Sequence, residues 1–190
     1  MKYFADKGYN CVALSFRNHG NSFKVKNMNS ISISDYITDL KNIVDTFDNE
    51  PIIIAHSMGG LVLQKYLEKY SCKAAVLMAP VPITGVLKTT LGFITKKWNY
   101  SIPSLITLNL YGLVNSVDKS KWAFFSDNLP KDQLTKYTNL LSNESYLAFL
   151  NMLFPNVKLN FHKKRPMLII AAENDNIFSV SENKLSLIHI

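Results

Sequence analysis

Residues 51–70 read PIIIAHSMGGLVLQKYLEKY, and this stretch decides how the rest of the chain is arranged. Its first four residues, 51–54, form a short apolar run that predicts a fully buried strand. Residues 61–70 carry apolar side chains at helical spacing, which predicts a helix. Between the two runs lies Ala55-His56-Ser57-Met58-Gly59-Gly60. The sequence therefore predicts a strand, a tight turn and a helix, with Ser57 where the chain reverses.

This turn has the features of a nucleophile elbow. A reversal this tight leaves little room around Ser57, so small residues are expected at its flanks, and these are Ala55 and Gly59. Gly60 lets the new helix pack close to the sheet. The hydroxyl of Ser57 is then exposed at a helix N-terminus, where the backbone N–H of Met58 points at the position of a developing oxyanion. The alternative is an ordinary helix opening that binds a phosphate.

The stretch resembles the α/β-hydrolase family, specifically its lipase-like and esterase-like members, such as lysophospholipases and monoacylglycerol lipases, with a GHSMGG elbow. Ala55 stands where the first glycine of G-x-S-x-G is usual. The residues that match the elbow are Ala55, His56, Ser57, Gly59 and Gly60. The resemblance implies a mostly parallel sheet flanked by helices, with a helical cap inserted over the active site.

Composition excludes several partners. The chain has 190 residues, 47% hydrophobic content and a net charge of +7. Only Arg17 and Arg165 are arginines, and the lysines are scattered, so no basic motif for a nucleic acid is present. No apolar run is long enough to span a membrane and no signal peptide is recognisable, so we expect a cytoplasmic protein with no membrane span.

The cysteines and histidines do not predict a metal site. Cys11 and Cys72 lie in or beside apolar runs, which predicts two buried thiols rather than a disulfide. No Cys/His spacing of the zinc type occurs, so no metal is expected. The resemblance implies no organic cofactor either.

Upstream of the elbow, residues 1–7 predict the end of a helix closed by Gly8, and residues 10–16 predict a buried strand. Residues 17–22 follow as a loop that resembles the family's R-x-H-G-x-S segment, in which His19 matches a structural histidine rather than a catalytic base. Ser32 and Asp35 form a capping box that opens an amphipathic helix.

Four segments are expected, with bounds at residues 1–80, 81–164, 165–184 and 185–190. Residues 1–80 form the N-terminal part of the hydrolase core, without its first strands, and residues 81–164 form a helical cap. The cap is rich in aromatic side chains, which suit an apolar substrate channel. For any one of them, such as Trp122 or Phe149, packing between cap helices is the expected role. Glu144 is expected in the first turn of a helix. Residues 165–184 return to the core, with a buried strand at 166–172.

The expected catalytic acid is Asp175. It follows the strand after the cap, and catalytic groups in such sheets gather beyond the carboxyl ends of strands. Serine followed by aspartate is also the family's chain order, with the histidine last. Glu173 is the alternative acid.

The expected base is missing. His189 comes only 14 residues after Asp175 and lacks the family's loop around it. Residues 185–190, LSLIHI, match one translated frame of a transposon-end sequencing adapter, so we expect them to be adapter read-through. The hydrolase fold is therefore expected to be incomplete at both ends, with its histidine outside this chain.

The resemblance implies a serine hydrolase for carboxylic esters with apolar acyl groups. Ser57 would attack the carbonyl, Met58 would stabilise the oxyanion, and Asp175 would orient a histidine. The expected partner is a small-molecule ester, and the fragment itself is expected to be inactive. The alternatives are a non-catalytic ligand-binding protein of the same fold, an amidase or aminopeptidase-like enzyme, and a cofactor-free peroxidase. Serine at the elbow argues against epoxide hydrolase and dehalogenase chemistry.

Overall fold

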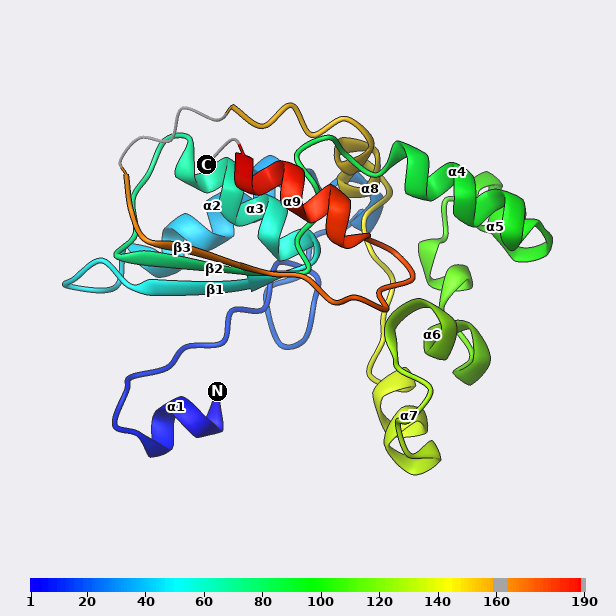
Figure 1. The fold of residues 1–190 in the computed structure, drawn as a ribbon, viewed down its shortest axis with the longest axis horizontal. Coiled ribbons are helices and arrows are strands. Elements are labelled where there is room, and N and C mark those ends of the chain that lie inside the picture. The colour runs from blue at the N-terminus through cyan, green and yellow to red at the C-terminus, as the bar shows by residue number, and fades with distance from the viewer. Residues whose placement is uncertain (159–163, 189–190) are drawn as a thin grey trace.

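A parallel three-stranded sheet forms the centre of the molecule. The structure is a computed structural model that describes residues 1–158 and 164–188. Strands β1 (Ile52–His56), β2 (Ala74–Met78) and β3 (Met167–Ile170) pair in the order β1-β2-β3. A group of helices lies beyond the carboxyl ends of these strands (Figure 1). The arrangement is a sheet of parallel strands with helices packed against it, as the sequence predicts.

Two helices build the core against one face of the sheet. Helix α2 (Ile33–Val44) begins at the predicted capping box, in which the hydroxyl of Ser32 accepts the N–H of Asp35 and the Asp35 carboxylate accepts the N–H of Ser32. Helix α3 (Met58–Leu67) follows β1 directly and packs on α2. The core that they form contains Tyr36, Leu61, Leu63, Leu67 and Leu77, all of which are fully buried.

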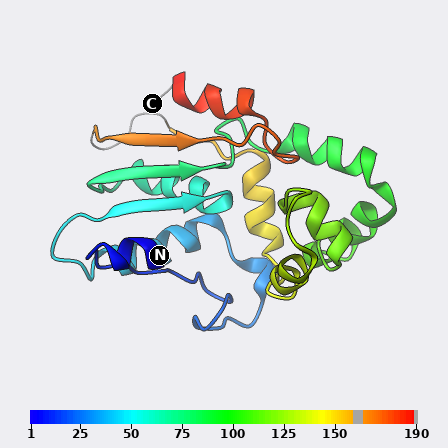
Figure 2. The ribbon, with the colours of Figure 1, turned by 60° about the horizontal axis from the view of Figure 1, so that its bottom comes forward.

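The other face of the sheet exposes apolar side chains. The prediction of a fully buried strand at 51–54 is wrong, because burial alternates along β1: Ile52 is 54% exposed, whereas Ile53 packs on the core. The paired register places exposed side chains of all three strands on the same face: Ile52, Ile54, Met78, Leu168 and Ile170. The helices α2 and α3 cover only the opposite face (Figure 2).

The predicted strand at residues 10–16 is absent. Helix α1 (Lys2–Asp6) ends before Gly8, which has the expected positive φ of 86°. The chain then runs on without strand pairing among the described residues, and Val12 is 55% exposed. A strand needs a partner for its backbone groups, and within the described chain only β2 pairs with β1. Cys11 is consequently only half-buried, whereas Cys72 is buried as predicted, and both thiols are free.

Helices and turns replace strands between β2 and β3. A short 3₁₀ turn in this segment is η2 (Leu110–Leu113), and another, η1 (Met28–Ser30), lies earlier in the chain, before α2. The helices of this segment are α4 (Leu87–Lys96), α5 (Trp98–Ile106), α6 (Val117–Phe124), α7 (Lys131–Thr138) and α8 (Tyr146–Leu153). After β3 the chain closes with α9 (Val180–Ile188). The helices α4 to α8 therefore stand beside the end of the sheet at which Ser57 follows β1.

Candidate active site

Ser57 occupies a strained turn between β1 and α3. Its φ of 51° and ψ of −122° lie outside the regions that most residues adopt. Such a conformation costs about 1 to 3 kcal/mol and persists only where the surroundings hold it in place. Because α3 begins at Met58, the first N–H groups of the helix lack the usual carbonyl partner four residues earlier within the helix. Ser57 is thus at the predicted reversal of the chain, next to a helix N-terminus.

The surroundings that hold this turn come from the end of β2. The backbone N–H of Ser57 donates to the carbonyl of Met78 at 3.1 Å. The carbonyl of Ser57 accepts the N–H of Val81 at 3.1 Å and the N–H of Gly60 at 2.9 Å. The backbone N–H and the carbonyl of Ser57 are therefore both hydrogen-bonded, so the backbone alone holds the turn and the side chain is not needed for it.

The close approach predicted for the elbow occurs at Gly60 and not at Gly59. A Cβ atom added to Gly60 would lie 2.5 Å from the Cβ and 2.9 Å from the Cα of Pro80. A Cβ atom on Gly59 would meet nothing within 4 Å. The expectation that Gly59 must be small because the turn is crowded is therefore wrong, since the side of the helix on which Gly59 lies is open.

A largely apolar cavity of about 330 Å³ reaches Ser57. Ser57 and Met58 line it together with side chains from α4, α5, α6 and α8, such as Phe93, Leu105, Phe124, Phe149 and Met152. Phe149 was predicted to serve only in packing between helices, which is wrong. Trp122 is not among the lining residues and packs edge-on against Phe93, with ring centroids 4.9 Å apart.

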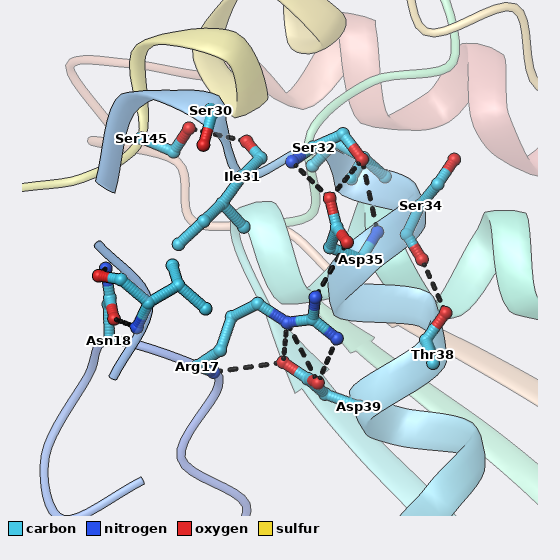
Figure 3. A network of polar contacts seen from close by, with 12 residues as sticks. Arg17, Asn18, Ser30, Ile31, Ser32, Ser34, Asp35, Thr38, Asp39 and Ser145 are labelled. Carbon is cyan, nitrogen blue, oxygen red and sulfur yellow. Dashed lines mark hydrogen bonds and ion pairs between the residues drawn. The ribbon is translucent and has the colours of Figure 1, made fainter. Parts of the chain in front are cut away.

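The loop at residues 17–22 is held against α2 by Arg17. Its guanidinium binds both oxygens of Asp39, with Nη2 at 2.6 Å from Oδ1, and Nη1 lies 2.7 Å from Oδ1 of Asp35 (Figure 3). The backbone N–H of Arg17 also donates to Asp39 at 2.9 Å. Asp39 is buried, and its hydrogen bond raises the pKa of Arg17. Hydrogen bonds from the backbone N–H and hydroxyl of Ser32 lower the pKa of Asp35.

His19 joins this loop to the start of α8. Its Nδ1 faces the carbonyl of Arg17 at 3.1 Å, and its Nε2 faces Oε2 of Glu144 at 3.5 Å. Both neighbours accept hydrogen bonds, so these contacts favour the protonated ring, which can donate from both nitrogens. The hydrogen bond with Glu144 accordingly raises the pKa of His19.

Glu144 was expected in the first turn of a helix but lies just before it, because the N-cap of α8 is Ser145. Its Oε1 accepts the hydroxyl of Tyr36 at 2.6 Å, and its side chain lines the cavity that reaches Ser57. Burial is the main reason that the pKa of Tyr36 is strongly raised, which keeps its hydroxyl protonated as a donor. Nothing in the local sequence indicates this role, since Tyr36 and His19 are distant along the chain.

Asp175 follows β3 in a loop that reaches the cavity. Its Oδ1 accepts the N–H of Ile177 at 2.7 Å and the N–H of Phe178 at 3.1 Å, and these two residues line the cavity. Asp175 itself is half-buried and is not among the lining residues, while Glu173 is exposed. The carboxylate thus organises its own loop, and its second oxygen is not used in these bonds.

The described histidines, His19 and His56, do not line the cavity. His56 is an exposed residue at the end of β1, and His162 and His189 lie outside the described residues. Among the residues that the structure describes, no group of three metal-binding side chains is close enough to hold an ion. Within the same ranges, no helix has both the length and the apolar character needed to cross a bilayer.

The family model for serine aminopeptidase, S33, matches residues 1–187 of the chain. The chain belongs to this family. A curated relative, epoxide hydrolase 1 of Caenorhabditis elegans, is 35% identical to this S33 chain over 71 residues, which is 37% of the chain and 17% of that protein. The S33 chain therefore aligns with only a small part of that relative.

Solved structures show the same α/β-hydrolase fold. A bromoperoxidase from Bacillus anthracis matches 92% of the S33 chain with a TM-score of 0.64 and 15% identity, over 67% of its own length. A monoacylglycerol lipase from Paleococcus ferrophilus matches 92% of the chain with a TM-score of 0.62 and 18% identity, over 66% of its own length. The chain thus spans about two thirds of these proteins, and likenesses at these identities concern the fold.

Proposed function

We propose that this chain is the nucleophile-bearing part of a serine hydrolase that cleaves carboxylic esters with apolar acyl groups. The observation that carries the proposal is the position of Ser57, which sits in a strained turn at a helix N-terminus and lines a cavity of apolar side chains. An exposed hydroxyl at a helix N-terminus is the geometry of an acyl-transfer nucleophile. An apolar cavity beside it accommodates an acyl chain.

In the proposed reaction, the hydroxyl of Ser57 attacks the ester carbonyl and its proton passes to a histidine. The N–H of Met58, the first residue of α3, stabilises the oxyanion of the tetrahedral intermediate. Asp175 orients the histidine, which the described residues do not supply. The alcohol leaves with the proton from the histidine, and water then hydrolyses the acyl-enzyme. The partner is a small-molecule ester.

In the same proposal, residues 81–164 act as a cap. Helices α4, α5, α6 and α8 provide most of the cavity wall opposite Ser57, which supports this role. The loop after β3 is linked to these helices, because the side chain of Asn176 donates to the carbonyl of Trp122 at 2.9 Å. This bond ties the loop that carries Asp175 to the cap.

The test uses the full-length protein that contains this chain. We expect a fluorophosphonate probe to label Ser57, and Ser57→Ala to abolish both labelling and ester hydrolysis. Retained turnover in a folded Ser57→Ala variant would contradict the proposal. We also expect Asp175→Asn to lower kcat by about 10⁴-fold, because the histidine would lose its working tautomer. Glu173→Gln is the matched control. If it lowered kcat more than Asp175→Asn does, the catalytic acid would be Glu173 instead.

A further inference from the structure

We infer that Gln64 is a positioning residue for the nucleophile. Its side-chain amide ties the loop after β2 to α3 and thereby fixes the backbone of Ser57. The inference rests on the proposed role of Ser57, and it concerns a residue that does not line the cavity and does not reach the substrate.

Gln64 is a buried polar residue in an apolar setting. It lies on α3 and has no exposed surface. Leu61, Leu63 and Leu67 of the same helix belong to the hydrophobic core. Its Nε2 donates to the carbonyl of Gly60 at 3.2 Å and to the carbonyl of Val81 at 3.1 Å. Both partners only accept, so the NH₂ end of the amide must face them.

The other end of the amide makes glutamine costly at this position. Its Oε1 is buried and has no hydrogen-bond partner among the described residues. Leaving a buried acceptor unpaired is costly, and an apolar side chain of the same length would avoid that cost. The two bonds made by Nε2 are therefore what distinguishes glutamine from methionine at this position.

These two bonds complete a closed path through the nucleophile. Val81 donates its N–H to the carbonyl of Ser57 and offers its own carbonyl to Gln64, which lies on the helix that begins directly after Ser57. Val81 also lines the cavity. A displacement of Val81 would thus move the serine backbone and the cavity wall at once.

Two backbone bonds also support the loop that Gln64 holds, because the N–H of Ala79 donates to the carbonyl of Ile170 at 2.7 Å and the N–H of Val81 donates to the carbonyl of Ser57 at 3.1 Å. The side chain of Gln64 adds the link to α3. Ala79 has a positive φ of 39°, which is strained for a residue with a side chain. Pro80 and Pro82 have no N–H to donate. Within the described chain, Gln64 makes the side-chain hydrogen bond to Val81 that holds this loop against α3. Without it, we expect the loop to relax and the strained turn at Ser57 to relax with it.

The test compares Gln64→Met with Thr138→Val in the full-length protein. Methionine keeps the length of glutamine and removes both donors. Thr138 is a matched control, because its buried hydroxyl bonds to Ser120 and to the carbonyl of Leu134, away from the elbow. For a p-nitrophenyl ester, we expect Gln64→Met to lower kcat by about 10-fold to 100-fold with KM nearly unchanged. We expect Thr138→Val to leave kcat unchanged.

A second measurement does not depend on catalysis or on a variant. In the unmutated protein, NMR hydrogen exchange should show that the side-chain amide of Gln64 and the backbone amides of Ser57 and Val81 become exposed in one common opening. Unchanged kcat in Gln64→Met, or independent opening of these three amides, would overturn the inference. If Ser57→Ala itself stays active, the proposed function fails, while the common opening still decides whether Gln64 holds the loop.

Discussion

Substituting alanine for either elbow glycine tests the packing of α3 directly. A Cβ at residue 60 would lie 2.5 Å from the Cβ and 2.9 Å from the Cα of Pro80, distances that real Cβ atoms do not tolerate. Pro80 cannot rotate away, because its ring fixes its side chain to the backbone. The helix and the loop after β2 must therefore separate in Gly60→Ala. In Gly59→Ala the added methyl group meets no atom within 4 Å.

Only Gly60→Ala should lower the free energy of unfolding. Overpacking a buried site lowers the free energy of unfolding by about 1 to 3 kcal/mol. Replacing glycine by alanine in a helix raises it by up to about 1 kcal/mol, because alanine has the higher helix propensity. We therefore expect Gly60→Ala to be destabilised by about 2 kcal/mol, which lowers Tm by about 4 to 8 °C in a chain of this size. We expect Gly59→Ala to be unchanged or stabilised by up to about 1 kcal/mol.

Urea unfolding followed by circular dichroism measures both changes, and the rate at which a fluorophosphonate labels Ser57 shows whether the elbow has moved. Gly60→Ala should be labelled more slowly, since separation of α3 from Pro80 displaces the turn. The reasoning is refuted if Gly60→Ala is as stable as the unmutated protein, or if Gly59→Ala is the more damaging of the two.

Other contacts give three further predictions. Asp39→Asn should lower the free energy of unfolding by about 2 to 4 kcal/mol in urea titrations, because it leaves the guanidinium of Arg17 without its buried partner; equal stability would contradict this role. The hydrogen bond with Glu144 raises the pKa of His19, so this pair stabilises the fold fully below about pH 6.5 and loses that contribution as the pH rises through the raised pKa. The stability difference between the unmutated protein and His19→Gln should therefore shrink from pH 6 to pH 9, and a constant difference would show that His19 is neutral. In a p-nitrophenyl ester series, kcat/KM should rise from acetyl to medium acyl chains, because each methylene buried in the apolar cavity adds about 0.8 kcal/mol; equal rates would argue against the cavity as the acyl site.

The sequence predicted the order of strand, tight turn and helix around Ser57 because these are local features. An apolar strand, a short turn with small residues and a helical pattern are all contained in residues 51–70, and the structure places Ser57 and Gly60 as that pattern requires. The capping box at Ser32 and Asp35 was equally predictable, since its partners are three residues apart.

Features that depend on distant partners were predicted poorly. Residues 10–16 have the composition of a strand, but strand formation needs a neighbour along the sheet, and none of the described segments pairs with them. An apolar run cannot show whether helices cover both faces of a strand, so the exposure of Ile52 and Ile54 was missed. Glu144 looked like a helix-terminal residue because its contacts, His19 and Tyr36, are on remote elements. Gln64 gave no signal for a similar reason, since one of its two partners, Val81, follows the next strand.

The strained turn at Ser57 also has a consequence for the order of events in folding. Apart from the local bond from the N–H of Gly60, the backbone bonds of Ser57 reach Met78 and Val81, so the turn lacks these two partners until β2 has paired with β1. Helix α3 can form earlier, because its hydrogen bonds are local. During refolding, we therefore expect the helical circular dichroism signal to return before the fluorophosphonate probe can label Ser57. The time at which labelling begins then reports when β2 has paired with β1.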